Sequence, residues 1–550
     1  MNREDLTERQ NNVLTAKYRV VLVTGGPGTG KTAAALWAGR EAIVTGEVAD
    51  DQYVLYLTFS RSAVSQISRR APQVLADARG RIEISTFHGL AYRLARSFGR
   101  YAGFGAEIPR IQSKAAEKLF GPQPGMVRYE DLVPAALKLL ERDWIASLVT
   151  RRWPLVISDE FQDTGDDQWD LIRRVGANAR LLLLADPDQM IHDFRDDVRP
   201  ERLDQARRLA DVEIELEKAS HRDRTERVPQ LAKAVLGRRF DDQAVAEALK
   251  GDALRVVPDV SFDELGPRVA EEVRRLRKSG CASVGVFGFT NDGSMQLSSQ
   301  LTALGLGNAI VGIPESHGEG LAAIGALLAH AVGEASMADV KVGLATFLTA
   351  VSRGGTAPPL AKLLIGQGDL PAEAEQLLRE MSGRLTEAAA SGTIGDVLKV
   401  VRGAWSSFIA DGVGTRLWLR AFGSFIGLAD GIAAQRPTAE RVRTLLDRGE
   451  RARAVALASE LDETRGVPVQ LMNFHQTKGR EADGVVLVFR PKDYYVHWTE
   501  DREPYEKRSR LLFVAISRAR QKVTVILPPQ PHQLVAPFRN LAAVEASGSR

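Results

Sequence analysis

A single cysteine, Cys281, stands among the 550 residues, so the chain cannot form an internal disulfide. Long apolar runs are also missing, and none approaches the roughly 20 residues that a helix needs to span a bilayer. Neither sign of charge dominates, because the chain has 73 lysines and arginines and 70 aspartates and glutamates, which gives a formal net charge of +3. These absences argue against secreted disulfide-rich proteins, membrane proteins and polycationic nucleic-acid binders. We therefore expect a cytoplasmic protein without a membrane partner, whose binding sites depend on local arrangements.

One stretch predicts a nucleoside triphosphate site. Val20 to Val23 form an apolar run typical of a buried strand, and the next residues match the phosphate-binding loop G-x-x-x-x-G-K-[ST]. Glycines let backbone N–H groups crowd around phosphate oxygens, and the following helix offers its positive N-terminal end. Lys31 is placed to reach the β- and γ-phosphates, and Thr32 to ligate Mg²⁺. The predicted cofactors are ATP and Mg²⁺, held by Gly25, Gly26, Pro27, Gly28, Thr29, Gly30, Lys31 and Thr32.

Further polar residues suited to phosphoryl transfer follow other apolar runs. Asp159 and Glu160 end the predicted strand Leu155 to Ser158. Asp159 can hold Mg²⁺ directly or through water, and Glu160 can activate or orient the attacking water. Gln189 follows a four-leucine strand and is a candidate sensor of the γ-phosphate. Upstream of the phosphate loop, the amide of Gln10 can both donate and accept, which suits it to read adenine.

Hydroxyl and aromatic residues end two more predicted strands, Val54 to Phe59 and Ile82 to Thr86. Because ligands bind at the carboxyl edge of a parallel sheet, these hydroxyls can contact phosphate, and the rings of Phe59 and Phe87 can stack on unpaired bases. Spacing alone is equally compatible with both rings lying in the core. The candidate nucleic-acid contacts derived in this way are Thr58, Phe59, Arg61, Thr86, Phe87, His192 and Phe194.

The chain as a whole reads as α/β. Predicted strands alternate with helices on both sides of a central segment, roughly Pro314 to Glu463, which is rich in Ala and Leu at helical spacing. This alternation predicts two domains with parallel sheets, the second carrying a helical insertion. A shorter interlude, Gly99 to Arg151, interrupts the first domain. From about Pro528 onward the sequence is typical of a loosely packed tail.

A series of motifs, in order, resembles the UvrD/Rep-like group of superfamily 1 helicases. The forms D-E-x-Q-D and V-A-x-[ST]-R-A are specific to this group. The resemblance implies two RecA-like domains with ATP in the cleft between them and single-stranded DNA across their tops. The matching stretches are Gln10, G-G-P-G-T-G-K-T at Gly25, T-F-S-R at Thr58, T-F-H-G-L at Thr86, D-E-F-Q-D-T at Asp159, A-D-P-D-Q at Ala185, H-R at His221, V-Q-L-M-N-F-H-Q-T-K-G-R-E at Val469 and L-L-F-V-A-I-S-R-A at Leu511.

The same resemblance implies roles for residues of the second domain. Arg222 and Arg518 match the two arginines that reach the γ-phosphate when the cleft closes. His221 stands where the family usually has tyrosine, and it can stack on adenine. Gly479 and Glu481 are expected at the nucleotide, Glu481 as a ribose or cleft contact, while DNA-side contacts are expected at His88 and His475. The predicted catalytic set is Lys31, Asp159, Glu160, Gln189, Arg222 and Arg518.

The expected domains follow from the motifs and the interruptions between them. The first RecA-like domain is expected at 1–98 and 151–212, and the second at 213–313 and 464–530. A small insertion at 99–150, a helical insertion at 314–463 and a tail at 531–550 complete the division.

Three functions remain open at this point. The first is an ATP-dependent DNA helicase or translocase that moves 3′ to 5′ and acts on single-stranded DNA or on single-strand/duplex junctions. The second is a DNA-dependent ATPase subunit of a nuclease partner, like the compact helicase subunits of Gabija-type antiviral defence. The third is a nucleotide-gated DNA-binding module without productive unwinding. The intact catalytic set argues against the third, and the short interlude favours ATP hydrolysis coupled to DNA binding over unwinding. The pathway, whether DNA repair, recombination or defence, is not specified by these residues.

Overall fold

The computed structural model describes residues 3–101, 110–191, 197–217, 223, 225–311, 314–352, 355–408, 412–458, 466–490 and 502–547. These residues belong to two compact units, each assembled from segments that are far apart in the sequence. Unit 1 comprises Met1–Leu90, Ala136–Gly312 and Asp462–Arg550, and unit 2 comprises Ala91–Ala135 and Ile313–Leu461.

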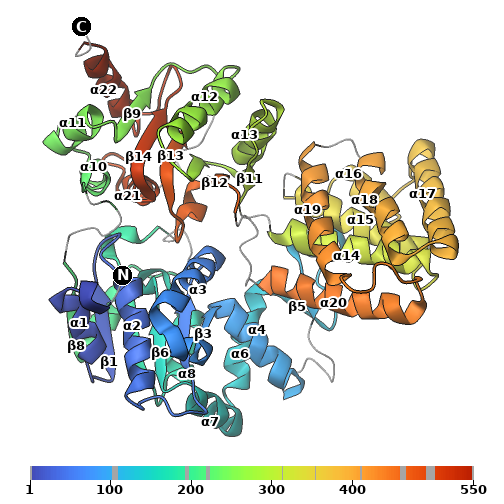
Figure 1. Cartoon of the computed structure of the whole chain (residues 1–550), viewed down its shortest axis with the longest axis horizontal. Coiled ribbons are helices and arrows are strands. Elements are labelled where there is room, and N and C mark those ends of the chain that lie inside the picture. Colours follow the sequence, from blue (N-terminus) through green and yellow to red (C-terminus); the bar gives the residue numbers. More distant parts are fainter. Residues whose placement is uncertain are drawn as a thin grey trace. The chain divides into compact units, whose positions relative to one another are not determined.

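Unit 1 contains two six-stranded sheets whose paired strands all run parallel (Figure 1). In the first sheet the strand order is β3-β2-β6-β7-β1-β8. Its inner strands are buried on both faces, which explains their continuous apolar runs. The strands are β1 (Val20–Thr24), β2 (Val54–Thr58), β3 (Ile82–Thr86), β6 (Leu155–Ser158), β7 (Arg180–Ala185) and β8 (Val212–Glu215).

Helices cover the first sheet. One apolar core joins α1, α2 and α3 to β1, β2, β6 and β7. Helix α2 connects β1 to β2 and α3 connects β2 to β3, and right-handed crossover connections place both helices on the same face of the sheet. Helix α4 begins in unit 1 and continues into unit 2. The helices are α1 (Glu8–Thr15), α2 (Lys31–Val44), α3 (Arg61–Leu75), α4 (Phe87–Phe98), α6 (Leu132–Leu139), α7 (Asp143–Arg152), α8 (Asp166–Val175) and α9 (Arg202–Leu209).

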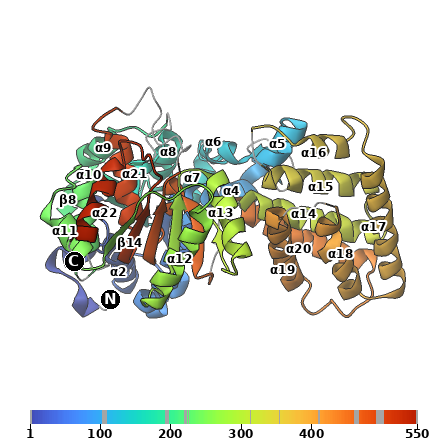
Figure 2. The same cartoon turned by 90° about the horizontal axis from the view of Figure 1, so that it is seen from above.

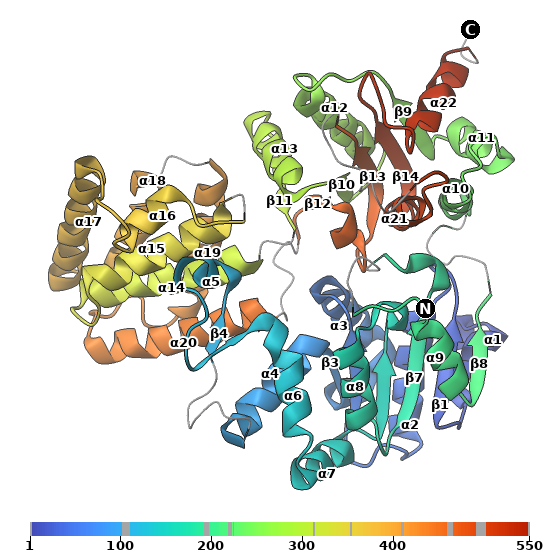
Figure 3. The ribbon, with the colours of Figure 1, turned by 180° about the vertical axis from the view of Figure 1, so that it is seen from behind.

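The second sheet has the strand order β11-β12-β10-β13-β14-β9. Its two faces carry separate cores, one with α10, α11, α21 and α22 and the other with α12 and α13 (Figure 3). Its strands are β9 (Leu254–Val257), β10 (Val284–Gly288), β11 (Ala309–Ile310), β12 (Val469–Asn473), β13 (Ala482–Val488) and β14 (Ala519–Ile526). Its helices are α10 (Arg227–Leu236), α11 (Gln243–Lys250), α12 (Leu265–Lys278), α13 (Asn291–Ala303), α21 (Glu506–Ile516) and α22 (Ala536–Ser547).

Two parallel sheets flanked by helices confirm the predicted α/β class with two RecA-like phosphate-loop domains. The expectation of a loosely packed tail after Pro528 is wrong for its first part. Leu534, Val535 and Phe538 are fully buried in the core of the second sheet, and α22 follows them. Short apolar clusters between prolines resemble surface loops in a sequence, which explains the error.

Unit 2 is mainly helical (Figure 2). Its centre is aromatic: the Phe347 ring contacts Trp405 and Trp418 edge-on, with ring centroids 4.5 and 5.3 Å away. Its elements are β4 (Arg110–Gln112), α5 (Lys114–Phe120), β5 (Met126–Arg128), α14 (Pro314–Ala331), α15 (Met337–Val351), α16 (Pro359–Leu364), α17 (Ala372–Ser391), α18 (Ile394–Phe408), α19 (Gly412–Leu428) and α20 (Ala439–Ala458).

Unit 2 combines the two segments that the sequence presents as separate insertions. The backbone N–H of Ala115 donates to Glu315 Oε1 at 2.6 Å. The buried Arg453 guanidinium pairs with Glu319 at 2.8 Å and donates to the carbonyl of Ile111 at 3.3 Å. Polar contacts of this kind pin the short segment onto the helices. Within the described part of the chain, no helix is both long enough and apolar enough to cross a membrane.

Candidate active site

The phosphate loop connects the end of β1 to the start of α2. Gly28 and Gly30 have φ angles of +82° and +88°, in the left-handed region that favours glycine. At Gly25 a Cβ would lie 2.8 Å from Thr29 Oγ1, so the tight turn also excludes side chains there. Helix α2 then begins at Lys31, so its first backbone N–H groups are directed at the loop.

Lys31 and Thr32, at the end of the loop, contact the loop backbone and the neighbouring carboxylates. Lys31 Nζ donates to the carbonyls of Gly25 and Gly26 at 2.5 and 3.0 Å and lies 3.5 Å from Asp186 Oδ2. The Thr32 hydroxyl donates to Asp159 Oδ2 at 3.2 Å. A cation and a hydroxyl–carboxylate pair therefore lie together beside the loop.

Gln10 lies behind the loop. Its side chain is fully buried, and Nε2 donates to the carbonyl of Thr29 at 2.9 Å while Oε1 accepts from the backbone N–H of Thr7 at 3.0 Å. These bonds fix α1 to the phosphate loop. The structure does not bring Gln10 into the lining of the cavity described below, where an adenine reader would need an open amide edge.

The carboxylate pair follows β6. Asp159 Oδ2 accepts from the Tyr56 hydroxyl at 2.9 Å, and Oδ1 accepts from the backbone N–H of Glu160 at 3.0 Å. Glu160 has a φ of +56°, an unusual angle for a residue with a side chain and a typical form of strain at functional sites. Burial raises the pKa of Asp159, and the adjacent Glu160 charge adds to the rise.

Two buried cations reach these residues from the second sheet. Lys478, between η7 (Phe474–Thr477) and β13, forms an ion pair with Asp163, lies 3.4 Å from Glu160 Oε2 and donates to the carbonyl of Gln189 at 2.7 Å. Arg518, just before β14, donates from Nη2 to Gln189 Oε1 at 2.6 Å. Both side chains are about 95% or more buried.

These cations affect the pKa of Glu160, the residue predicted to activate the attacking water. Burial alone would raise the pKa of Glu160, but the charges of Lys478, Lys31 and Arg518 outweigh it and lower the pKa below its ordinary range. Glu160 Oε2 also accepts from Gln162 Nε2 at 2.7 Å. The carboxylate is therefore ionised at neutral pH, and the Gln162 amide holds it in one orientation.

A cavity of about 430 Å³ lies between these groups. The phosphate loop and α3 form one wall, and the segments leading into β13 and β14 form the other. At its rim Glu481 accepts from Arg70 at 3.0 Å and from Arg520 at 2.9 Å, while Gly479 adopts a φ of +72°. Predicted site residues that line the cavity are Gly26, Pro27, Gly28, Thr29, Gly30, Lys31, Thr32, Asp159, Glu160, Gln189, Gly479, Glu481 and Arg518.

The residues present suit a magnesium ion. Thr32 and Asp159 offer neighbouring oxygen ligands at the wall of the cavity, joined by the hydrogen bond from the Thr32 hydroxyl to Asp159 Oδ2, and Mg²⁺ is commonly bound by one or two protein oxygens together with phosphates and waters. Among the described residues, no cluster of three or more His, Cys, Asp or Glu side chains is arranged to hold a metal. A cation shared with nucleotide phosphates fits this arrangement.

The predicted nucleic-acid contacts separate into different environments. Phe87 is 1% exposed, so its ring belongs to the core, and the prediction that it stacks on a base is corrected. Thr86 Oγ1 accepts from the backbone N–H of Gly89 and so caps the start of α4. Thr58 is also fully buried. Thr86 and Phe87, which the sequence assigned to a ligand, therefore have roles in the fold.

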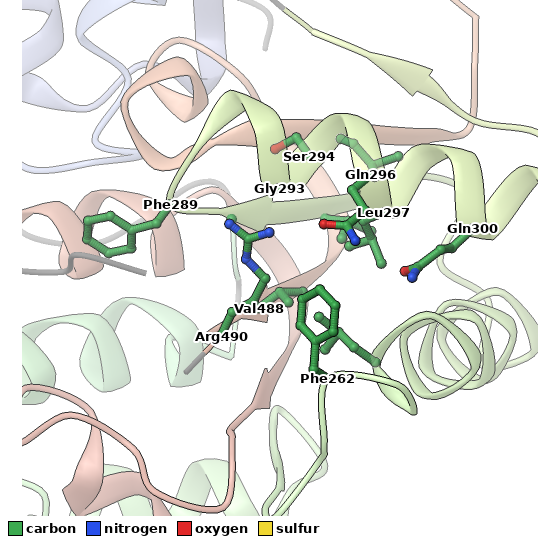
Figure 4. Close-up of a pocket in the computed structure, with 13 residues that line it drawn as sticks. Phe262, Phe289, Gly293, Ser294, Gln296, Leu297, Gln300, Val488 and Arg490 are labelled. Atoms are coloured by element: carbon green, nitrogen blue, oxygen red, sulfur yellow. The ribbon is translucent and has the colours of Figure 1, made fainter. Parts of the chain in front are cut away.

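Phe59, His88 and His475 are half-buried and are compatible with the predicted DNA contacts. The predicted residues outside the described part of the chain are His192, Phe194, His221 and Arg222, as is the side chain of Arg61. A second hollow lies beside the second sheet, between the start of α12 and one side of α13 (Figure 4). Arg490 crosses it and donates to Thr290 Oγ1 at 2.9 Å, with Phe262 and Phe289 at its sides.

Sequence reasoning missed several residues of the site. Lys478 lies inside a quoted motif, but a lysine is normally solvated, and only the fold shows that this one is buried. Tyr56 stands in the middle of an apolar strand and gave no polar signal. Arg70 and Arg520 pair with Glu481 from elements that the sequence does not bring together.

These features define a class of protein: phosphate-loop nucleotide hydrolases with two RecA-like domains, in which the second domain supplies cations to a nucleotide held by the first. A domain described as "AAA domain" matches residues 9–195. ATP-dependent DNA helicase UvrD2 of Mycobacterium tuberculosis (strain H37Rv) is 24% identical over an alignment that covers 94% of this chain and 77% of the relative.

Other relatives match over shorter regions. DNA helicase II of Escherichia coli is 22% identical over 252 residues, 35% of each chain. RecBCD enzyme subunit RecB of Mycolicibacterium smegmatis is 39% identical over 74 residues, 13% of this chain and 7% of the relative. In these two comparisons the matched part spans about a third or less of the relative's length. Together the matches confirm the resemblance to UvrD/Rep-like superfamily 1 helicases.

Proposed function

We propose that the protein is an ATP-dependent DNA helicase or translocase that hydrolyses ATP in the cavity between its two parallel sheets, is stimulated by single-stranded DNA and moves 3′ to 5′. The observation that carries the proposal is the hydrogen bond of 2.6 Å from Arg518, on the second sheet, to Gln189, on the first. It links a candidate γ-phosphate sensor to a candidate arginine finger inside one cavity.

The residues divide the chemistry between them. The loop N–H groups and Lys31 bind the β- and γ-phosphates, and Thr32 and Asp159 would hold Mg²⁺, which would supply charge neutralisation to the phosphates. Glu160, ionised and held by Gln162, accepts a proton from the attacking water. Arg518 stabilises the charge that develops on the transferred phosphoryl group.

Stimulation by DNA follows from this division. Lys31 and Glu160 belong to the first sheet, while Lys478 and Arg518 belong to the second. A single strand that contacts both domains favours the arrangement in which these groups meet. The size of the stimulation is then set by the difference in DNA affinity between the two arrangements.

The test is a steady-state ATPase assay of nucleic-acid-free protein, with and without a single-stranded oligonucleotide. We expect slow turnover alone and a marked rise with DNA. Equal rates in the two conditions would refute the coupling. Duplexes with a 3′ or a 5′ single-stranded tail then test direction, since 3′-to-5′ movement displaces the strand only from the 3′-tailed substrate. An ATPase that serves a separate nuclease would pass the first assay and fail the second.

A further inference from the structure

Tyr56 carries a polar group into the centre of the first sheet. Its side chain is fully buried in β2, and its hydroxyl donates to Asp159 Oδ2 at 2.9 Å. The register explains the contact, because Tyr56 pairs with Ile157 of the parallel strand β6 and Asp159 follows two residues later. A buried tyrosine hydroxyl needs a partner, and here that partner is the carboxylate assigned to Mg²⁺.

The Tyr56 hydroxyl is one of three hydrogen-bond donors to the Asp159 carboxylate. Oδ2 also accepts from the Thr32 hydroxyl at 3.2 Å, and Oδ1 accepts from the backbone N–H of Glu160 at 3.0 Å. An ionised carboxylate has about four lone-pair directions. Two hydroxyls occupy both directions of Oδ2, which leaves the remaining direction of Oδ1 for a metal or a metal-bound water.

Resting on the proposed function, we propose that Tyr56 is a positioning residue for the magnesium site: it holds Asp159 in the one orientation that presents Oδ1 to the metal. Tyr56 itself touches neither nucleotide nor metal, because it does not line the cavity and acts through Asp159. Partners of this kind around metal ligands typically contribute 10- to 100-fold in metal affinity or activity.

Apolar packing alone does not account for a tyrosine at this position. The ring lies in the core with Val54 and Ile157, where phenylalanine would fill the same space. The hydroxyl adds hydrogen bonds to Asp159 and to the phosphate-loop residue Thr32, and Asp159 in turn accepts from Thr32. Tyr56 thereby links the interior of the sheet to the metal site.

Tyr56→Phe removes this hydroxyl and keeps the ring. We expect the affinity for Mn²⁺ in the presence of ADP, measured by the electron paramagnetic resonance signal of free Mn²⁺, to fall about tenfold. The Mg²⁺ concentration that gives half-maximal ATP hydrolysis should rise by a similar factor, and turnover at saturating Mg²⁺ should approach that of the wild type. Recovery at high Mg²⁺ and an unchanged thermal melting temperature would distinguish this effect from damage to the fold.

Two further variants sharpen the test. Tyr53→Phe removes a hydroxyl three residues earlier, where the ring packs against Arg152, and should leave both metal measurements unchanged. Tyr56→Leu also lacks the hydroxyl but changes the volume. If only the leucine variant weakens metal binding while Tyr56→Phe matches the wild type, the effect is one of packing and the inference is wrong. If the wild type itself neither binds Mn²⁺ with ADP nor hydrolyses ATP, the proposed function fails instead.

Discussion

The two sheets of unit 1 have the same parallel architecture but present opposite ends to the nucleotide cavity. The first sheet uses the carboxyl ends of its strands, where the phosphate loop leaves β1 and Asp159 leaves β6. The second sheet uses the segments that lead into its strands, since Gly479 precedes β13 and Arg518 precedes β14. The carboxyl-end rule for ligand sites therefore applies to one half of this site and fails for the other.

The two sheets also differ in the charge that they contribute. Carboxylates dominate the catalytic part of the first sheet, whereas the second contributes the buried cations Lys478 and Arg518. A buried charge is costly unless it is paired. Each half therefore depends on the other for compensation, which makes hydrolysis sensitive to contact between the sheets.

Replacing the arginine of the second sheet should have the largest effect. Arg518→Lys keeps the charge but loses the planar fork that contacts phosphate oxygens bidentately. We expect DNA-stimulated turnover to fall about a thousandfold, with fold, ATP binding and DNA binding retained. Thermal melting and single-stranded DNA titrations provide the check. Arg255→Lys, on β9 of the same sheet, is the matched control. Near-normal stimulated turnover would remove Arg518 from the chemistry.

Replacing Glu160, the proposed general base on the first sheet, should have the second-largest effect. Glu160→Gln keeps size and hydrogen bonding, so ATP should still bind while hydrolysis falls by about a hundredfold. Fluorescent nucleotide binding and single-turnover hydrolysis separate the two steps. Lys31→Ala should show the converse pattern, with weaker binding. Normal turnover of Glu160→Gln would show that another group is the base.

A Lys478 variant tests whether the second sheet also orients the carboxylates of the first sheet. Lys478→Met removes the cation paired with the fully buried Asp163 and lying near Glu160. Hydrogen bonds to charged groups are worth about 1.5–3 kcal/mol, so kcat should fall about 10- to 100-fold while KM for ATP changes little. Partial rescue by Lys478→Arg would support a positioning role. Lys522→Met, whose lysine pairs with Asp252 on the same sheet, should have no such effect.

The smallest effect is expected for the two phenylalanines, and it distinguishes a ring that contacts DNA from a ring that belongs to the core. Phe59→Ala should weaken single-stranded DNA binding by on the order of 1 kcal/mol if its half-buried ring stacks on a base. Phe87→Ala should instead lower the free energy of unfolding by about 3–5 kcal/mol, because its ring is in the core. Fluorescence anisotropy with labelled oligonucleotide and denaturant unfolding measure the two quantities. DNA affinity lost by the Phe87 variant alone would reverse this assignment.

The sequence predicts the inner strands well and the edge strands poorly. The runs at Val20, Leu155 and Leu181 are buried on both faces and read as continuous apolar segments. The edge strands β8, β9 and β11 were not predicted, because short edge strands bury less and have weaker patterns, whereas the edge strand β3 was predicted correctly from the run Ile82 to Thr86. Pattern reasoning thus finds the centre of each sheet before its borders.

The active site divides in a similar way. Residues in the phosphate loop and the acidic motif were predicted because their spacing within one segment reflects the chemistry. Tyr56 and Lys478 were not, since each depends on a partner more than a hundred residues away. Gln10 shows the reverse case, a motif residue whose amide is bonded to the loop rather than placed in the cavity.

The composition of unit 2 has an evolutionary consequence. Two separate segments of the chain form this unit, Ala91–Ala135 and Ile313–Leu461. The buried Arg453 joins both, through Ile111 and Glu319. A descendant gene that lost only one segment would leave the other with an uncovered surface, and loss of the shorter segment would also remove the Ile111 carbonyl that accepts a hydrogen bond from Arg453. The two insertions should therefore be inherited, shortened or lost as a pair.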